Sequence, residues 1–146
     1  MFRKALVGYD GSKSAKAALQ CAVALAEDSA LELTALWVRD PLPLDSDLPS
    51  EVAGEKEATD GYFTERCEEI RDLAELHGVN IRCVARAGHP AKTIVQHADE
   101  GGYDLIVIGH SVHSELWGRL VGDIADRIAD HAHCSVLIVK NRESEN

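Results

Sequence analysis

The sequence predicts an α/β fold, in which a parallel sheet is covered by helices on both of its faces. Short runs of branched apolar residues alternate with longer amphipathic segments along the whole chain. The run Leu105–Ile108 is typical, because it is almost wholly apolar and turn-forming Gly102 and Gly109 bound it. A strand of this kind is expected to be buried on both faces, as in sheets that are joined by right-handed helical crossovers.

Five strands and four helices are expected. The strands are Lys4–Gly8, Leu31–Val38, Val79–Ala85, Leu105–Ile108 and Val136–Lys140. The helices run from Ser12 to about Glu27, from about Glu55 to His77, from Pro90 to about Asp99, and from about Asp123 to His131. In the first helix, the residues expected to face the core are Ala15, Ala18, Leu19, Ala22, Leu25 and Ala26. In the second helix, the apolar residues available to the core are Tyr62, Cys67, Ile70, Leu73, Ala74 and Leu76.

Local signals support these boundaries. Ser12 can cap the first helix, Gly78 is well placed just after the second, and Pro90 suits the first turn of the third. Between the second strand and the second helix, Arg39 to Gly54 contains three prolines among acids and serines. This composition predicts a long, mobile and protease-sensitive surface loop.

Composition limits the class of protein. The chain has 146 residues, 45% of them hydrophobic and 27% charged, so we expect one globular domain over 1–146. No apolar run approaches the roughly 18 residues that span a membrane, and the N-terminus lacks the features of a secretory signal. We therefore expect a cytoplasmic protein. Its net charge of −10 argues against binding to nucleic acid or to anionic lipid.

Most of the excess negative charge lies in one segment. Residues 45–75 hold eleven acids and three bases, which gives eight of the ten excess charges. We expect a solvated surface; the alternative is a docking face for a basic protein partner. The four cysteines, Cys21, Cys67, Cys83 and Cys134, form no C-x-x-C pair and are expected to be reduced and mostly buried.

The segment from Asp104 to Ile128 combines a strand, a loop that ends in Gly122, and a helix N-terminus. In α/β proteins this arrangement binds phosphate through free backbone N–H groups and the helix dipole. Gly109 and Gly122 match the first and third glycines of G-x-x-G-x9-G-[ST], the C-terminal signature of the universal stress protein family. Near the start of the chain, the run ALVGYDGSKSAKAAL is similar to that family's first strand and turn. Near its end, the run CSVLIVK is similar to the family's last strand. The chain resembles the family from Arg3 to Lys140.

The resemblance implies an adenine nucleotide alpha hydrolase-like fold with strand order 3-2-1-4-5. Strands one and four are then neighbours, and ligands of open α/β sheets bind at such a switch point. It places the nucleotide-binding positions at Gly8, Asp10, Val38, Ile108, Gly109, Val112, Gly122, Asp123 and Ile124. Asp10 has an alternative role, because in the sequence YDGS it can form an Asx turn that starts the first helix.

Two of these positions depart from the family signature. Val112 stands at its second glycine, where a β-branched side chain disfavours positive φ and fills space near the phosphates. Asp123 stands at its Ser or Thr, where a carboxylate caps the helix and repels a triphosphate. Weakened or absent ATP binding is therefore the first hypothesis. The alternative is an ATP- or AMP-binding protein with a variant loop, possibly a slow ATPase, in which Asp123 becomes a ligand of Mg²⁺ that accompanies the nucleotide.

The sequence shows no arrangement for catalysis, neither a G-x-S-x-G elbow nor a P-loop. His110 and His113 provide at most half of a zinc site, so no metal is expected without nucleotide. A third and more distant hypothesis is an unrelated α/β enzyme of flavodoxin-like shape. The resemblance otherwise implies a protein of stress response or regulation. Because an apolar last strand at a sheet edge needs cover, it also implies a homodimer formed through Val136–Lys140.

Overall fold

The computed structural model describes residues 1–39, 49–111 and 124–141. Its centre is a five-stranded sheet in the order β3-β2-β1-β4-β5, and every neighbouring pair is parallel. The strands are β1 (Lys4–Gly8), β2 (Glu32–Arg39), β3 (Ile81–Ala87), β4 (Leu105–Ser111) and β5 (Ser135–Asn141). The fold class and the strand order expected from the sequence are confirmed.

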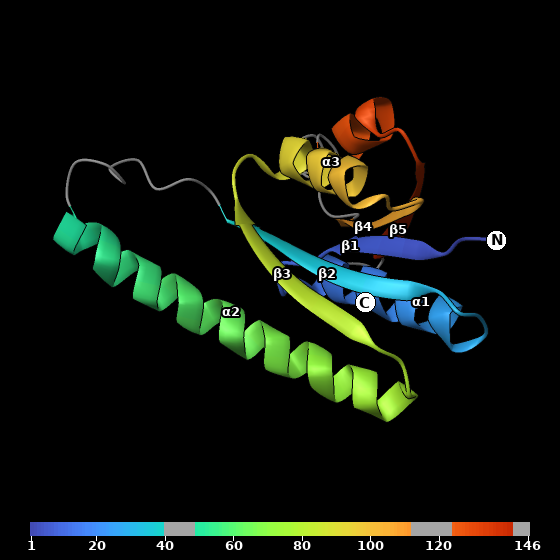
Figure 1. Cartoon of the computed structure of the whole chain (residues 1–146), viewed down its shortest axis with the longest axis horizontal. Coiled ribbons are helices and arrows are strands. Elements are labelled where there is room, and N and C mark those ends of the chain that lie inside the picture. The colour runs from blue at the N-terminus through green and yellow to red at the C-terminus, as the bar shows by residue number, and fades with distance from the viewer. Residues whose placement is uncertain (40–48, 112–123, 142–146) are drawn as a thin grey trace.

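Helices cover both faces of the sheet (Figure 1). Helices α1 (Lys13–Glu27) and α2 (Pro49–His77) lie on one face, while α3 (Pro90–Gly101) and a helix described over residues 124–131 lie on the other. Within the described residues, no helix is long and apolar enough to cross a membrane.

The core consists of two apolar layers that the sheet separates. Alternating side chains of β4 make this clear, since Leu105 and Val107 pack with α1 while Ile106 and Ile108 pack with α3 and the last helix. All four are nearly inaccessible to solvent. The central strands are buried on both faces, as the sequence predicted.

The local end signals are confirmed. Ser12 accepts a hydrogen bond from the N–H of Ala15 at 3.2 Å, Pro90 is in the first turn of α3, and Gly78 follows α2 with φ of 66°. The N–H of Gly78 donates to Glu75 O, and that of Val79 donates to Ala74 O. These two hydrogen bonds close the C-terminal end of the helix, and the left-handed conformation of Gly78 permits them.

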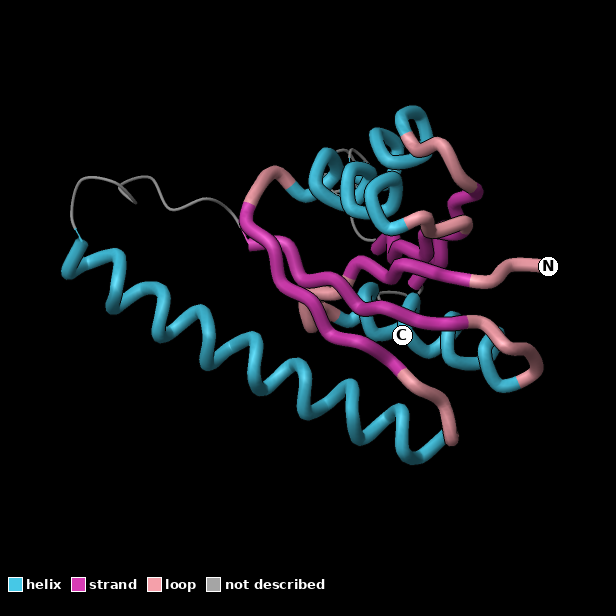
Figure 2. The backbone as a smooth tube through the Cα atoms, viewed as in Figure 1, coloured by secondary structure: helices cyan, strands magenta, loops and turns pink. Residues whose placement is uncertain are grey.

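The boundary of α2 was predicted wrongly. The helix begins at Pro49, so the last residues of the expected loop, 49–54, are helical. Proline is tolerated in a first helical turn, because the N–H that it lacks would have no acceptor within the helix there. The tubes in Figure 2 show this long helix beside the sheet. Residues 40–48, to which the rest of the mobility prediction refers, lie outside the described residues.

Candidate functional site

The carboxyl ends of β1 and β4 meet at the switch point of the sheet, where the chain turns to opposite faces. Gly8 ends β1 beside Ile108: a Cβ atom added to Gly8 would lie 2.9 Å from Ile108 Cδ1 and 3.2 Å from Ile94 Cδ1. A Cβ on Gly109 would lie 2.2 Å from the carbonyl oxygen of Ser14, at the start of α1. Position 109 therefore requires glycine, because its neighbour is the backbone of Ser14, whereas the neighbours of Gly8 are terminal methyl groups that can shift.

Asp10 follows β1 and forms the Asx turn that the sequence suggested. Its Oδ1 accepts the N–H of Ser12 at 2.9 Å, and Gly11 between them has φ of 84°. The hydroxyl of Ser12 in turn caps α1. The carboxylate of Asp10 is exposed to solvent at the switch point, so the turn uses one of its oxygens while the side chain remains accessible.

The remaining expected site residues are spread more widely. Val38 is half-buried near the carboxyl end of β2, the neighbour of β1, and its side chain packs in the layer beneath α3. Ile124 is 38% exposed in the first described turn of the last helix. Val112, Gly122 and Asp123 lie outside the described residues. The structure thus brings Gly8, Ile108 and Gly109 into contact range and places Asp10 and Val38 at the same edge of the sheet.

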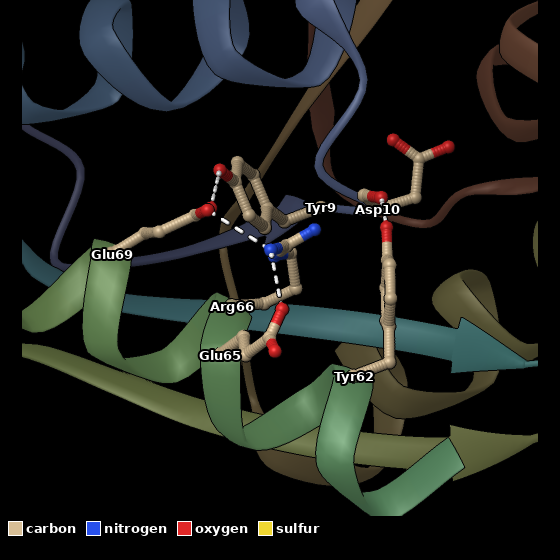
Figure 3. Close-up of polar contacts among 6 residues, drawn as sticks. All are labelled: Tyr9, Asp10, Tyr62, Glu65, Arg66 and Glu69. Atoms are coloured by element: carbon tan, nitrogen blue, oxygen red, sulfur yellow. Dashed lines mark hydrogen bonds and ion pairs between the residues drawn. The ribbon is translucent and has the colours of Figure 1, made fainter. Parts of the chain in front are cut away.

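A polar cluster on α2, not anticipated from the sequence, holds the turn at Asp10 (Figure 3). The hydroxyl of Tyr62 donates a hydrogen bond to the backbone oxygen of Asp10. Arg66 pairs with Glu69 at 3.0 Å and lies over the Tyr62 ring, 4.5 Å from its centroid. Burial, followed by the charge of Glu69, raises the pKa of Tyr9 to about 12, and the Tyr9 hydroxyl donates to Glu69 at 3.4 Å.

The spacing of Tyr62, Arg66 and Glu69 is a signal that sequence reasoning missed. These residues recur at intervals of four and three, so they share one stripe of α2. Trp37 of β2 supports the stripe from the sheet, with its ring 5.0 Å from Tyr62 and stacked 6.0 Å from Phe63. The acids of this segment were expected on a solvated surface, and those of α2 whose exposure the structure describes are exposed. The stripe of Tyr62, Arg66 and Glu69 nevertheless contacts the turn at the switch point and the tyrosine before it.

One further feature of this edge is a buried nitrogen without a hydrogen-bond partner. His110 follows Gly109 on β4, and its Nδ1 atom is buried without a hydrogen-bond partner. A buried polar atom of this kind costs about 1–3 kcal/mol unless a partner satisfies it. Since neighbouring residues of a strand face opposite sides, Gly109 packs on α1 and the His110 ring points to the face of α3.

The same region contains no assembled metal site among the residues that the structure describes, where no group of three His, Cys, Asp or Glu side chains converges. His113, the second histidine of the H-x-x-H pair, lies outside them. The described arrangement provides close backbone approach, a carboxylate and an imidazole. Together these groups can bind a polar ligand.

Comparison with protein families identifies the chain. The model of the universal stress protein family matches residues 1–140. This chain belongs to the universal stress protein family. Universal stress protein MJ0531 of Methanocaldococcus jannaschii is 32% identical over 147 residues, which cover 99% of this chain and 86% of that protein.

Solved structures agree with this assignment. The structure of hypothetical protein MJ0577 is 25% identical, with a TM-score of 0.81 and 99% of both chains covered. A universal stress protein crystallised in complex with cAMP is 26% identical, with a TM-score of 0.71, and the match covers 94% of this chain and 97% of that one. The fold expected from the resemblance is therefore the fold of the family.

Proposed function

We propose that this universal stress protein acts in stress response or regulation as a homodimer, and that its nucleotide site binds ATP weakly or not at all. The carrying observation is a contrast within one site. The glycines that allow close approach, Gly8 and Gly109, are retained and tightly packed. The two signature positions that are expected to contact phosphate carry Val112 in place of glycine and Asp123 in place of serine or threonine. The glycines near the expected ligand are thus kept, while the residue at the helix start opposes the negative charge of the phosphates.

The charge argument concerns the phosphates in particular. A carboxylate at the start of a helix accepts the free N–H groups that a phosphate would otherwise use, and it repels the negative oxygens. The effect should be larger for ATP than for AMP, because ATP has more negative charge at that end. A regulatory protein needs no chemical step at this site, so loss of the phosphate contacts is compatible with a function in protein binding.

A second candidate function is adenine-nucleotide binding through the variant loop. Two observations favour it: a relative of 26% identity is known in complex with cAMP, and the buried Nδ1 of His110 lacks a partner. In this case Gly8 and Val38 would line the adenosine side, and Gly109 and Gly122 the phosphate side. Asp123 would bind Mg²⁺ that accompanies ATP.

Titration calorimetry with AMP and with ATP, each with and without Mg²⁺, separates the two candidates. We expect the wild-type protein to bind ATP in the high micromolar range or more weakly. The double variant Val112→Gly, Asp123→Ser should bind ATP more tightly by roughly 2–3 kcal/mol, from regained backbone contacts and one removed repulsion. The two gains need not add, because both residues face the same ligand.

The matched control is Asp126→Ser, which removes an exposed carboxylate from the same helix outside the loop. It should leave ATP affinity nearly unchanged. Tight, Mg²⁺-dependent binding of ATP by the wild type, lost in Asp123→Ser alone, would overturn the proposal and establish the second candidate.

A further inference from the structure

Two of the four cysteines meet where α2 packs on the sheet. The thiol of Cys67 on α2 lies close enough to that of Cys83 on β3 to contribute to the raised pKa of Cys83. Both are partly buried and unoxidised. They are 16 positions apart in the sequence. They come together because β3 follows α2 in the chain and runs back beside it, as Figure 1 shows.

The packing around the pair is defined by the same helix face. Phe63, Cys67, Ile70 and Ala74 recur at intervals of four and three, so they lie on one stripe of α2. Ile70 and Ala74 are buried in the core. Cys83 lines a small cavity together with Phe63 and Ile70, the residues one turn before and one turn after Cys67. The Cys83 side chain therefore faces the stripe at the level of Cys67.

We propose that Cys67 and Cys83 form a dithiol site that peroxides oxidise to an intramolecular disulfide between α2 and β3. The proposal is independent of nucleotide binding. It assigns these two thiols a modification chemistry, whereas the composition of the chain suggested only small buried side chains. In a reducing compartment such a disulfide would be transient, as is usual for disulfides that report on oxidants.

The two steps balance with peroxide as the only oxidant. The Cys67 thiolate attacks one peroxide oxygen, the O–O bond breaks, and the second oxygen leaves with a proton as water, which gives a sulfenic acid. The Cys83 sulfur then attacks the sulfur of Cys67, the S–O bond breaks, and the Cys83 proton leaves with the hydroxyl group as a second water. Two thiols and one peroxide become one disulfide and two waters.

The environment decides the order of the steps. Burial, followed by the hydrogen bond to Cys67, raises the pKa of Cys83 to about 12, so this sulfur stays protonated at neutral pH. Thiolates are the nucleophiles in such reactions. Cys67 is therefore the thiol that attacks the peroxide, and Cys83 resolves the sulfenic acid as its proton passes to the departing hydroxyl group. The nearby Arg71 guanidinium only partly offsets the raised pKa of Cys83, so we expect the resolving step to be slow.

The disulfide would fasten the sheet edge to the helix that holds the switch-point turn. Cys67 lies five residues after Tyr62, whose hydroxyl group donates a hydrogen bond to the backbone oxygen of Asp10. A covalent link at Cys67 removes the freedom of α2 to lift from β3 at this level. Oxidation should therefore slow the local opening of α2 around residues 62–74.

The test uses the full chain with Cys21→Ser and Cys134→Ser, so that only the proposed pair remains. After treatment with hydrogen peroxide, the intact mass should fall by the mass of two hydrogens, and neither thiol should then react with iodoacetamide. Reductant should restore both thiols. Amide exchange of α2 should be slower in the oxidised than in the reduced protein.

Two controls define the opposite results. Adding Cys67→Ser or Cys83→Ser to the same background should abolish the loss of two hydrogens while leaving the circular dichroism spectrum unchanged. The converse variant keeps Cys21 and Cys134 and has only Cys67→Ser and Cys83→Ser. It should not lose the mass of two hydrogens on treatment with peroxide. The proposal is wrong if peroxide leaves Cys67 and Cys83 open to alkylation, or if it links them only between two molecules.

Discussion

Asp104 joins the beginnings of β1 and β4, which are neighbours in the sheet although a hundred residues separate them. Its carboxylate accepts the N–H of Arg3 at 2.9 Å and that of Lys4 at 3.1 Å. These two backbone hydrogen bonds, Arg3 first, lower the pKa of Asp104. Lys4 completes the join, since its ammonium group donates to Gly101 O at 2.7 Å.

The depressed pKa predicts how stability depends on pH. A carboxyl group whose pKa is lower in the folded than in the unfolded chain stabilises the fold above its unfolded pKa of about 4, and this contribution is lost as pH falls through the folded pKa. We expect Asp104→Asn to lower the free energy of unfolding at pH 7 by about 1 kcal/mol or less, because solvent screens the carboxylate. The difference from wild type should shrink toward pH 3.

Urea denaturation at pH 7 and at pH 3 measures this difference. Asp126→Asn, an exposed acid of the last helix, serves as the control and should differ little from wild type at either pH. An equal loss of stability for Asp104→Asn at both pH values would show that the charge of this carboxylate is irrelevant.

At the scale of elements, α1 shows both the strength and the limit of periodicity. Its start is encoded locally, because Ser12 needs only the N–H of Ala15 to cap the helix. Its buried stripe was predicted correctly except at its two edges, where Val23 is buried on one side and Leu25 is 41% exposed on the other. Periodicity locates the centre of an apolar stripe, but the neighbouring elements decide which edge they cover.

The same limit applies to α2. Leu76 was expected to be available to the core, but it is 78% exposed because it lies off the stripe through Ile70 and Ala74. The start of this helix was also missed, since prolines and acids near Pro49 are equally compatible with a loop and with a first helical turn.

The cap of α1 can be tested by substitution. Ser12→Ala should destabilise the protein by roughly 0.5–2 kcal/mol, because one backbone N–H at the start of the helix loses its acceptor. Thermal and chemical denaturation measure the loss. Ser12→Asn keeps a side-chain acceptor and should retain most of the stability; if both variants lose the same amount, capping is not the reason.

At the scale of the whole molecule, the edge strand β5 is the surface that most needs cover by another chain. The strand is at the edge of the sheet and pairs only with β4 among the described strands. Val136 and Ile138 pack toward one layer of the core, and Leu137 and Val139 toward the other, yet all four remain partly exposed. An apolar edge strand of this kind is prone to aggregate unless another chain pairs with it.

The proposed homodimer predicts a mass and a way to reduce it. Sedimentation equilibrium at micromolar concentration should give twice the chain mass of 15.9 kDa. Ile138→Lys should shift the mass toward that of one chain, because a charge would be buried between the two edge strands. Ala85→Lys, an exposed position on the opposite edge strand β3, should leave the dimer intact. A wild-type mass of 15.9 kDa would refute this assembly.

Part of the candidate site could be inferred from sequence because its residues follow strands directly. Gly8, Asp10 and Gly109 stand at or just after the ends of β1 and β4, and parallel strands place their carboxyl ends at one edge. The support from α2 could not be inferred in this way. Tyr62 meets Asp10 across 52 positions of the chain, and no local rule states which turn of a long helix packs at the switch point.

The sequence by itself determined the alternation of strands and helices, the caps at Ser12, Gly78 and Pro90, and the family resemblance. These depend on interactions within a few residues or on short motifs, so they can be recognised without a partner. Only the tertiary structure decided how α2 packs, and with it the hold on Asp10, the unpartnered nitrogen of His110 and the contact of Cys67 with Cys83. Each of these depends on burial between elements that are distant in the chain, which local propensity does not encode.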